Sequence, residues 1–320
     1  MIMSFIIPAR NEERTIGACL DAVGNLNHVR ASYETILMDN GSTDKTVAIA
    51  TQKGATVYTV PNVTISALRN LGAQKSQAEY LAFIDADCVI ETDWLRNALA
   101  RFHDPAVACV GCHPNPPSVG SWVQRTWALQ NRRAAGVEDV DWLPSMNIVV
   151  RKSAFVDVGG FNESLTTCED VDFCYRLKKK GYRVLSDLSL GSVHYGEART
   201  VREFFKKERW RGQSNLQGLW SHGFYWSELP SVLLPVAYLI LLGGLPASFF
   251  YLLKGFPAPL AINFAGILLP PTLLALRTSK RARDFGCFGK LAYLYFIYAI
   301  ARTAAIMPLK SVERITASYT

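Results

Sequence analysis

The stretch EYLAFIDADCVIETDWL, residues 79–95, decides which fold we expect for this chain. The run from Tyr80 to Ile84 is short, apolar and rich in aromatic residues, which predicts a buried strand. Asp85 and Asp87 follow at once, and alternate residues at an extended strand end share one face. A carboxylate beside a core strand costs free energy unless a partner stabilises it. The stretch therefore predicts a strand that ends at a site for a partner of two carboxylates.

The residues before this stretch alternate between short apolar runs and polar, helix-like segments. Asn11 is expected to open the first helix, and Ser42 or Thr43 to cap the second. Such alternation indicates βαβ units and a largely parallel sheet, in which ligands bind beyond the carboxyl ends of the strands. The expected strands cover residues 3–9, 33–41, 55–60 and 80–87, and the expected helices cover residues 11–26, 42–54 and 65–76.

Composition narrows the choice of partners. The chain has 320 residues, 49% of them hydrophobic, and a formal net charge of +7. That charge suits an anionic partner such as a nucleotide, a phospholipid or a nucleic acid. Because the bases gather beside apolar segments, anionic lipid is favoured and no nucleic-acid partner is expected. Seven scattered cysteines without a pairing framework indicate reduced thiols in a cytosolic compartment.

The C-terminal third differs sharply from the rest. Residues 229–253 and 256–276 carry no charge, and residues 291–309 carry only Arg302. About 20 apolar residues are enough for a helix to span a bilayer. We therefore expect two to three transmembrane helices. The alternative is a buried helical domain packed on the sheet.

The bases near these segments predict an orientation. The sequence RTSKRARDFGCFGK, residues 277–290, carries five of them, and the positive-inside rule places such a loop in the cytoplasm. A multi-pass protein of the cytoplasmic (inner) membrane with a cytoplasmic catalytic domain is expected. Residues 200–227 mix bases with aromatic side chains, as an amphipathic segment on a membrane surface does. The expected domains are residues 1–199, 200–227 and 228–320.

Six motifs occur in a fixed order along the first two thirds of the chain: FIIPARNEE, ILMDNGSTDKT, ALRNLGA, FIDAD, VGGFNESLTTCEDVDFCYRLKKKGYRV and KKERWRG. Together, over about Met3 to Gly212, they resemble the family 2 glycosyltransferases, which are inverting enzymes with a GT-A fold. The resemblance implies a Rossmann-like α/β domain with a mostly parallel sheet flanked by helices. It also implies transfer of a sugar from a nucleotide-sugar donor.

The resemblance assigns the first loops to the nucleotide. Pro8, Ala9 and Glu12 would line the nucleoside pocket, with Glu12 reaching the ribose. Asp39 would accept a hydrogen bond from the base, as a carboxylate can from a ring N–H. The Asn-Gly and Ser-Thr-Asp residues that follow Asp39 also have turn and cap chemistry. Arg69 would lie near the base or the diphosphate, and the alternative for it is a solvated helix arginine.

A metal site is expected at the Asp-Ala-Asp triplet. Two hard oxygen ligands suit Mn²⁺ or Mg²⁺, and such an ion would neutralise charge on a leaving nucleoside diphosphate. By resemblance Asp87 is the principal ligand, and Asp85 contacts the ribose or the metal. His194, in GSVHYG, would complete the site, and the alternative is a structural histidine.

An inverting transfer is one in-line displacement and needs a base opposite the leaving group. By resemblance Asp170 is that base, and Glu169 helps to place the acceptor or the base. The alternative is an acidic first helical turn favoured by the helix dipole. Both residues precede the helix-like sequence VDFCYRLKKKG.

The sequence KKERW, residues 206–210, is similar to the QxxRW signature of membrane polysaccharide synthases. Arg209 would bind phosphate through its planar guanidinium, and Trp210 would stack on an acceptor or anchor in the interface. Lys206 stands where the signature has Gln, and this disfavours processive polymerisation.

These observations predict a hexosyltransferase that moves a sugar, with UDP-sugar as the favoured donor by family habit, onto a lipid-linked or glycan acceptor. Its place would be the cytoplasmic membrane face, in synthesis of a cell envelope polysaccharide, with membrane lipid as a further partner. One alternative is a processive exopolysaccharide synthase. Another is a catalytically idle membrane scaffold that binds nucleotide.

Overall fold

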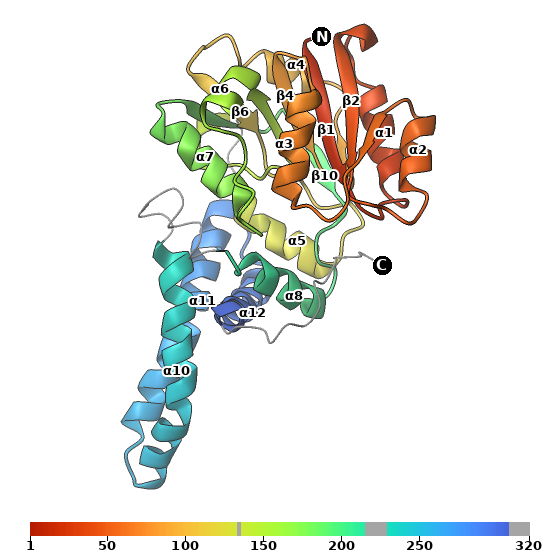
Figure 1. The fold of residues 1–320 in the computed structure, drawn as a ribbon. Helices are drawn as coiled ribbons and strands as arrows, with labels where there is room; N and C mark the ends of the chain where they lie inside the picture. The colour runs from red at the N-terminus through yellow and green to blue at the C-terminus, as the bar shows by residue number, and fades with distance from the viewer. Residues whose placement is uncertain (133–135, 215–228, 307–320) are drawn as a thin grey trace. The chain divides into compact units, whose positions relative to one another are not determined.

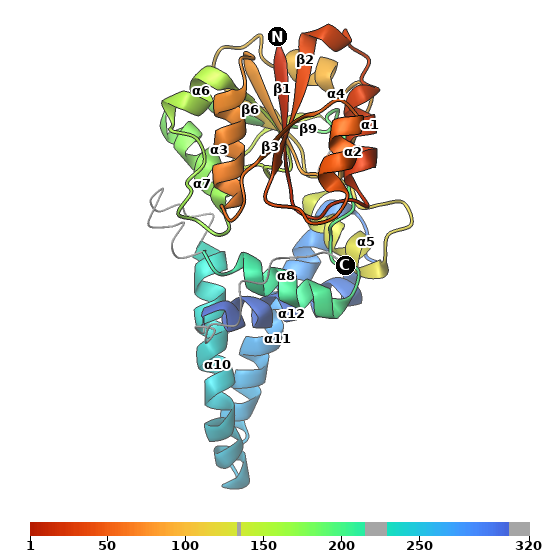
Figure 2. The same cartoon turned by 45° about the vertical axis from the view of Figure 1, so that its right-hand side comes forward.

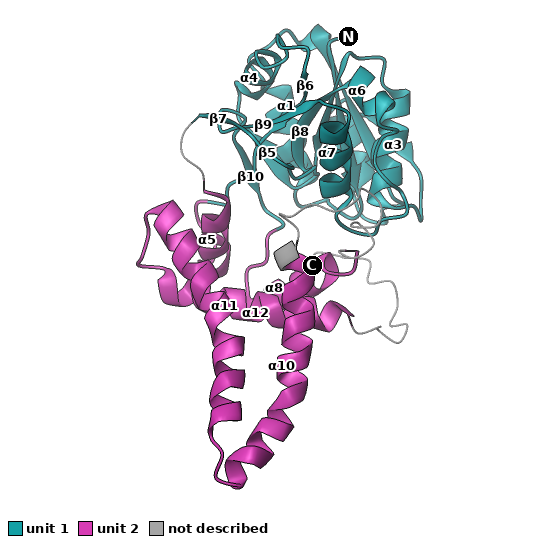
Figure 3. Cartoon of the chain, turned by 90° about the vertical axis from the view of Figure 1, so that its left-hand side faces the viewer, with its two compact units in different colours: residues 1–117, 135–196, 313–320 teal, residues 118–134, 197–312 magenta. Residues whose placement is uncertain are grey.

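The computed structural model describes residues 1–132, 136–214 and 229–306. They form two compact units, each with its own core (Figure 3). Among the described residues, unit 1 comprises 1–117 and 136–196, and unit 2 comprises 118–132, 197–214 and 229–306. Each unit is described on its own below.

Unit 1 is built on an eight-stranded sheet with the strand order β3-β2-β1-β4-β8-β6-β9-β7. β8 and β7 run opposite to the other six strands. The expected α/β fold with a mostly parallel sheet is therefore confirmed. The strands of this sheet are β1 (Met3–Ala9), β2 (Tyr33–Asp39), β3 (Thr56–Thr59), β4 (Tyr80–Ile84), β6 (Val107–Gly111), β7 (Val137–Asp139), β8 (Asn147–Arg151) and β9 (Arg183–Asp187). A separate antiparallel pair joins β5 (Cys88–Ile90) to β10 (Ser192–His194).

Helices cover both faces of the sheet (Figures 1 and 2). Alternation along β1 explains why: Phe5 and Ile7 enter one core, while Ile6 enters the other. The first core is closed by α1 (Ile16–Gly24), α2 (Thr46–Gln52) and α4 (Trp94–Leu99). The second is closed by α3 (Ile65–Lys75), α6 (Lys152–Asp157) and α7 (Glu169–Lys179).

Two helix starts differ from expectation. Asn11 does not open α1, because its φ of 56° is left-handed and the helix begins at Ile16. Its side chain and backbone instead bond to Thr43 and Ser42, so those two residues tie loops together and do not cap α2. α2 begins at Thr46, whose backbone N–H donates to Asp44 Oδ1 at 3.0 Å.

Unit 2 is helical, with two helices long and apolar enough to cross a membrane. The apolar spans cover Ser231–Leu253 and Ala258–Ala282, with mean hydropathies of 2.0 and 1.7. Only 17% and 22% of the most apolar stretch of each helix is buried, whereas the core helix of a soluble protein is mostly buried. The helices are α5 (Trp122–Ala128), α8 (Val201–Arg211), α10 (Leu229–Leu253), α11 (Ala258–Ala282) and α12 (Phe288–Ile306), with a 3₁₀ turn, η2 (Leu129–Asn131).

The third apolar segment has another environment. Among the described residues, α12 has 19 residues but is not apolar enough to rank with α10 and α11 as a candidate membrane span. Its Arg302 donates to Glu208 Oε2 of α8 at 2.9 Å. α11 also runs on to Ala282, so Arg277 and Lys280, expected in a loop, are helical. The predicted juxtamembrane segment is described only up to residue 214, and its remainder lies outside the described residues.

Candidate functional site

One edge of the sheet in unit 1 collects most of the residues that the sequence singled out. β2, β1 and β4 are parallel neighbours, so their carboxyl ends, Asp39, Ala9 and the residues after Ile84, lie at the same edge. β8 runs the other way, so its start lies there too, and Ile84 pairs with Asn147. Parallel α/β sheets bind ligands at this edge.

The loops after β1 and β2 are bonded to each other. Pro8 and Ala9 are buried at the end of β1, beside Met38 and Asp39 of β2. Asp39 is 1% exposed, and its carboxylate accepts hydrogen bonds from the backbone of Gly41 at 3.2 Å and Ser42 at 3.1 Å. Asp39 thus does have the turn chemistry that its neighbours predicted, and its contact with a nucleobase stays a prediction.

Glu12 lies in the loop after β1, and its pKa is raised. Its Oε2 accepts from the Thr15 hydroxyl at 2.7 Å. Burial, followed by the charges of Asp87, Asp85 and Asp44, raises the pKa of Glu12 to about 7 although the Thr15 bond lowers it. A carboxyl of this kind can donate or accept a hydrogen bond near neutral pH.

The loop after β4 that carries Asp85 and Asp87, here called the DxD loop, contacts β10. Asp87 Oδ2 lies 3.1 Å from His194 Nε2, and the ligand atoms of Asp87, Cys88 and His194 all lie within 4.8 Å of one another. A Cβ at Gly196 would lie 2.0 Å from Asp87 Oδ2, so glycine leaves space beside the carboxylate. Burial and the neighbouring acids raise the pKa of the Cys88 thiol well above its ordinary value, so Cys88 fits a metal less well. An oxygen and an imidazole nitrogen fit Mn²⁺, which accepts both.

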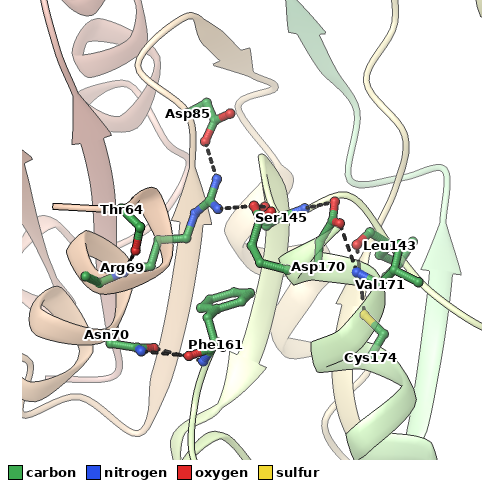
Figure 4. Close-up of polar contacts among 12 residues, drawn as sticks. Thr64, Arg69, Asn70, Asp85, Leu143, Ser145, Phe161, Asp170, Val171 and Cys174 are labelled. Carbon is green, nitrogen blue, oxygen red and sulfur yellow. Dashed lines mark hydrogen bonds and ion pairs between the residues drawn. The ribbon is translucent and has the colours of Figure 1, made fainter. Parts of the chain in front are cut away.

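Arg69 is not a solvated helix arginine: it is 1% exposed. Its Nη2 donates to Asp85 Oδ1 at 2.8 Å (Figure 4). Its Nη1 donates to Glu169 Oε1, also at 2.8 Å. The guanidinium also lies 5.6 Å from the ring centroid of Phe161. Burial would lower the pKa of Arg69, but the charges of Asp85 and Glu169 outweigh it and raise the pKa. One cation thus joins two acids that are far apart in sequence.

Glu169 and Asp170 begin α7, after Cys168 in a left-handed conformation with φ of 64°. Both lie in the first turn, so the helix-start interpretation of these acids describes their position correctly. Asp170 Oδ1 accepts from the Val171 backbone at 2.9 Å and Oδ2 from the Ser145 backbone at 3.4 Å (Figure 4). Burial, then the charge of Glu169, raises the pKa of Asp170 to about 7. A general base works best with a pKa near the working pH.

The sequence did not single out Ser145 or Gly196. Ser145 donates its hydroxyl to Glu169 Oε1 at 3.4 Å as well as its backbone N–H to Asp170. It reaches the site because β8 is antiparallel, which no local pattern around residue 145 indicates. The glycine in HYG, residues 194–196, was a visible signal, since it follows the predicted ligand His194.

Arg209 and Trp210 belong to α8 in unit 2. Arg209 is half-buried and Trp210 is 45% exposed. Their expected contacts with the diphosphate and the acceptor stay predictions.

Comparisons with known proteins show what this chain is similar to. The model of the family "Glycosyl transferase family 2" matches residues 4–162. Glycosyltransferase AglE of Haloferax volcanii is 29% identical over 227 residues, which cover 67% of this chain and 73% of that protein. The pre-mycofactocin glycosyltransferase of Mycobacterium tuberculosis is 31% identical over 158 residues, covering 47% of this chain and 33% of that protein.

A solved structure shares the fold. The mannosyltransferase PcManGT from Pyrobaculum calidifontis, in complex with GDP-Man and Mn²⁺, has a TM-score of 0.60 at 17% identity, covering 94% of this chain and 86% of that one. The sheet and the sequence match together support a GT-A domain and a sugar-transfer activity. Residues 4–162 of the chain therefore form a family 2 glycosyltransferase domain.

Proposed function

We propose that this protein is an inverting glycosyltransferase that moves one sugar from a nucleotide-sugar to a lipid-linked or glycan acceptor at the cytoplasmic face of a membrane. The carrying observation is the pair of bonds from Arg69 to Asp85 and Glu169. These bonds hold the DxD loop and the start of α7 at one sheet edge, where donor and base must meet.

In this mechanism Asp170 takes the proton of an acceptor hydroxyl as the hydroxyl oxygen attacks the anomeric carbon. The bond from that carbon to the nucleoside diphosphate breaks, and the diphosphate leaves as an anion. Asp87, with Asp85 and His194, would hold a divalent cation whose charge stabilises the leaving diphosphate. The Mn²⁺ bound to PcManGT supports this use of the DxD loop, and Mg²⁺ suits the same hard ligands.

Pro8, Ala9, Glu12 and Asp39 would contact the nucleoside. Their support is position, since all lie at or just after the carboxyl ends of β1 and β2. A uridine donor is favoured by the habit of the family. Solved structures of similar fold bind either GDP-Man or UDP-GlcNAc, so a GDP donor belongs in the test.

A lipid-linked acceptor is supported by the two apolar helices and by a relative. A protein of Methanococcus voltae, 23% identical over 236 residues, is named dolichyl N-acetyl-alpha-D-glucosaminyl phosphate 3-beta-D-2,3-diacetamido-2,3-dideoxy-beta-D-glucuronosyltransferase. The bases of residues 277–290 favour a cytoplasmic site for the catalytic domain.

The test is transfer by purified membranes, with Mn²⁺ or Mg²⁺, across UDP-, GDP- and dTDP-sugars, with products extracted into organic solvent. We expect metal-dependent label in the lipid phase, lost in Asp87→Ala and kept in the control Asp21→Ala, whose side chain is 61% exposed. One added sugar per acceptor is expected. A ladder of products would favour the processive synthase, and no release of nucleoside diphosphate with any donor would favour the idle scaffold.

A further inference from the structure

Residues 118–132 lie in the sequence between two strands of unit 1 but pack within unit 2 (Figure 3). Their helix α5 turns Val123 and Trp127 into the core of that unit. The Trp127 ring centroid lies 4.6 Å from that of Phe204 on α8 and 5.2 Å from that of Tyr295 on α12. The segment is therefore an integral part of the helical unit.

The outer face of α5 carries side chains typical of a membrane surface. Trp122 and Arg125, three residues apart and so on one side of the helix, are both exposed. Val119, just before the helix, is 92% exposed. The Trp122 ring lies 6.5 Å from the ring of Tyr293 on α12, which is also exposed. Tryptophan and tyrosine are enriched at the headgroup level of bilayers.

Exposed bases adjoin this face. Arg281 on α11 donates to the carbonyl of Gln130 in η2, which fixes the end of the 118–132 segment against α11. Residues 277–290 contain five bases and a single acid, Asp284. The four other bases are Arg277, Lys280, Arg283 and Lys290, and all of them are exposed.

The sequence of α11 indicates where the bases of residues 277–290 would lie relative to a bilayer. The helix is uncharged from Ala258 to Leu276, and its bases begin at Arg277. If α11 crosses a bilayer, the change at residue 277 marks the headgroup level, and the Arg281–Gln130 bond holds η2 there. Positive charge at that level is complementary to anionic headgroups.

We propose that residues 118–132 and 277–290 form one surface that binds anionic phospholipid headgroups. The inference rests on the membrane attachment in the proposed function. The internal segment 118–132 would then be a second lipid contact beside the two apolar helices. Each base near an anionic leaflet strengthens binding to that leaflet by about fivefold.

The full chain in nanodiscs provides the test. Each disc contains phosphatidylcholine with an equal fraction of brominated phosphatidylcholine or brominated phosphatidylglycerol. The tryptophan fluorescence of the wild type minus that of Trp122→Phe reports quenching of Trp122. We expect brominated phosphatidylglycerol to quench Trp122 at least about threefold more strongly, because the bases recruit it.

The charge variant Arg277→Gln/Lys280→Gln/Arg283→Gln should lose this preference. Arg277→Lys/Lys280→Arg/Arg283→Lys should keep it, which separates loss of charge from loss of fold. The matched control Lys75→Gln/Lys179→Gln/Lys180→Gln removes three exposed bases of unit 1 and should keep it too. Trp122 left unquenched by both lipids, or quenched equally by both, would overturn the inference.

Failure of the proposed function gives different results. Loss of all sugar transfer with the lipid preference intact would overturn the enzymatic proposal alone. Release of the chain from membranes by alkaline carbonate would overturn the spanning helices. Co-flotation of the released chain with phosphatidylglycerol vesicles, and not with phosphatidylcholine vesicles, would still support the headgroup surface.

Discussion

Each unit buries a cluster of ionised side chains, and the two clusters differ in their balance of charge. In unit 1 the guanidinium of Arg69 faces two carboxylates at 2.8 Å, and further acids, Asp87 and Asp170, lie at the same sheet edge. In unit 2 the relation is reversed. The buried carboxylate of Glu208 has two guanidinium partners, Arg211 at 2.8 Å and Arg302 at 2.9 Å.

The difference separates a reactive site from a structural one. In unit 2 cations compensate the buried acid: Arg211 pairs with it within α8, and Arg302 joins α12 to α8. In unit 1 the acids exceed the cations, so burial raises the pKa values of Glu12 and Asp170 to about 7. Because the negative charge of these acids is not fully compensated, the site favours binding of a proton or a metal cation. Carboxyl groups with perturbed pKa values cluster at functional sites. The predictions below test this contrast.

Asp170→Asn should have the largest effect. The amide cannot accept the proton of the acceptor, so the rate of transfer should fall by about 10³-fold or more, while nucleotide-sugar binding persists. Transfer kinetics and equilibrium binding of the donor check both parts. Glu163→Gln removes an exposed acid and should behave as the wild type. Full turnover in Asp170→Asn would remove Asp170 from the mechanism.

Arg69→Gln tests the excess of acid directly. It leaves the buried Glu169 and the partly buried Asp85 without their shared cation, which should lower the free energy of unfolding by about 3 kcal/mol and weaken transfer. Arg69→Lys keeps the charge but cannot bridge both acids, so an intermediate loss is expected. Denaturant unfolding in detergent measures the free energy of unfolding of both variants, and transfer kinetics measure the loss of activity. An unchanged free energy of unfolding for Arg69→Gln would mean that the two ion pairs contribute nothing to the fold.

Local pattern predicted the first four strands of unit 1 and the helices between them, but not the strands from β5 to β10. The strand at residues 3–9 and the helix at 229–253 have the expected bounds, because each is a continuous apolar run closed by a clear change in composition. The starts of α1 and α2 were wrong, because Asn11 bonds across to Ser42 and Thr43, and no propensity encodes a contact between loops 31 and 32 residues apart.

The candidate site was predicted less fully. The acids could be named because the motifs contain them, but their partners depend on the topology of the sheet. Arg69 was expected at the nucleotide, and its buried bonds to Asp85 and Glu169 come from α3 and α7 covering the same face. Ser145 reaches Asp170 because β8 reverses direction, which the alternation of strands and helices did not indicate.

The pH dependence of kcat/KM should report the raised pKa of Asp170. With a pKa of about 7, the base loses activity as pH falls, so kcat/KM should drop tenfold per unit and about 100-fold at pH 5. The raised pKa stabilises the fold fully below about pH 4 and this contribution is lost as pH rises through about 7. Asp170→Asn should therefore melt above the wild type at pH 8 and not at pH 4. A flat profile between pH 5 and 8 would contradict the assignment of the base.

His194→Ala should reduce metal affinity without abolishing transfer. Asp87 remains as the principal ligand, so the Mn²⁺ concentration for half-saturation should rise by about tenfold. Titration calorimetry of Mn²⁺ with the nucleotide present measures this without turnover. His113→Ala is the matched control, because His113 stacks edge-on with Trp142 at 5.3 Å. Equal metal affinity in His194→Ala and wild type would make His194 a structural partner of Asp87.

Arg302→Gln should have the smallest effect, because Glu208 keeps Arg211 as a partner. We expect a loss of about 1 kcal/mol in the free energy of unfolding, since one charged hydrogen bond is removed from an acid that remains paired. Arg302→Lys should recover part of it. The difference between the losses in Arg302→Gln and Arg69→Gln is the informative quantity. Both changes delete one ion-paired guanidinium, but only in unit 1 are acids left without a cation. Equal losses in the two variants would show that the acid excess in unit 1 is not what distinguishes the site.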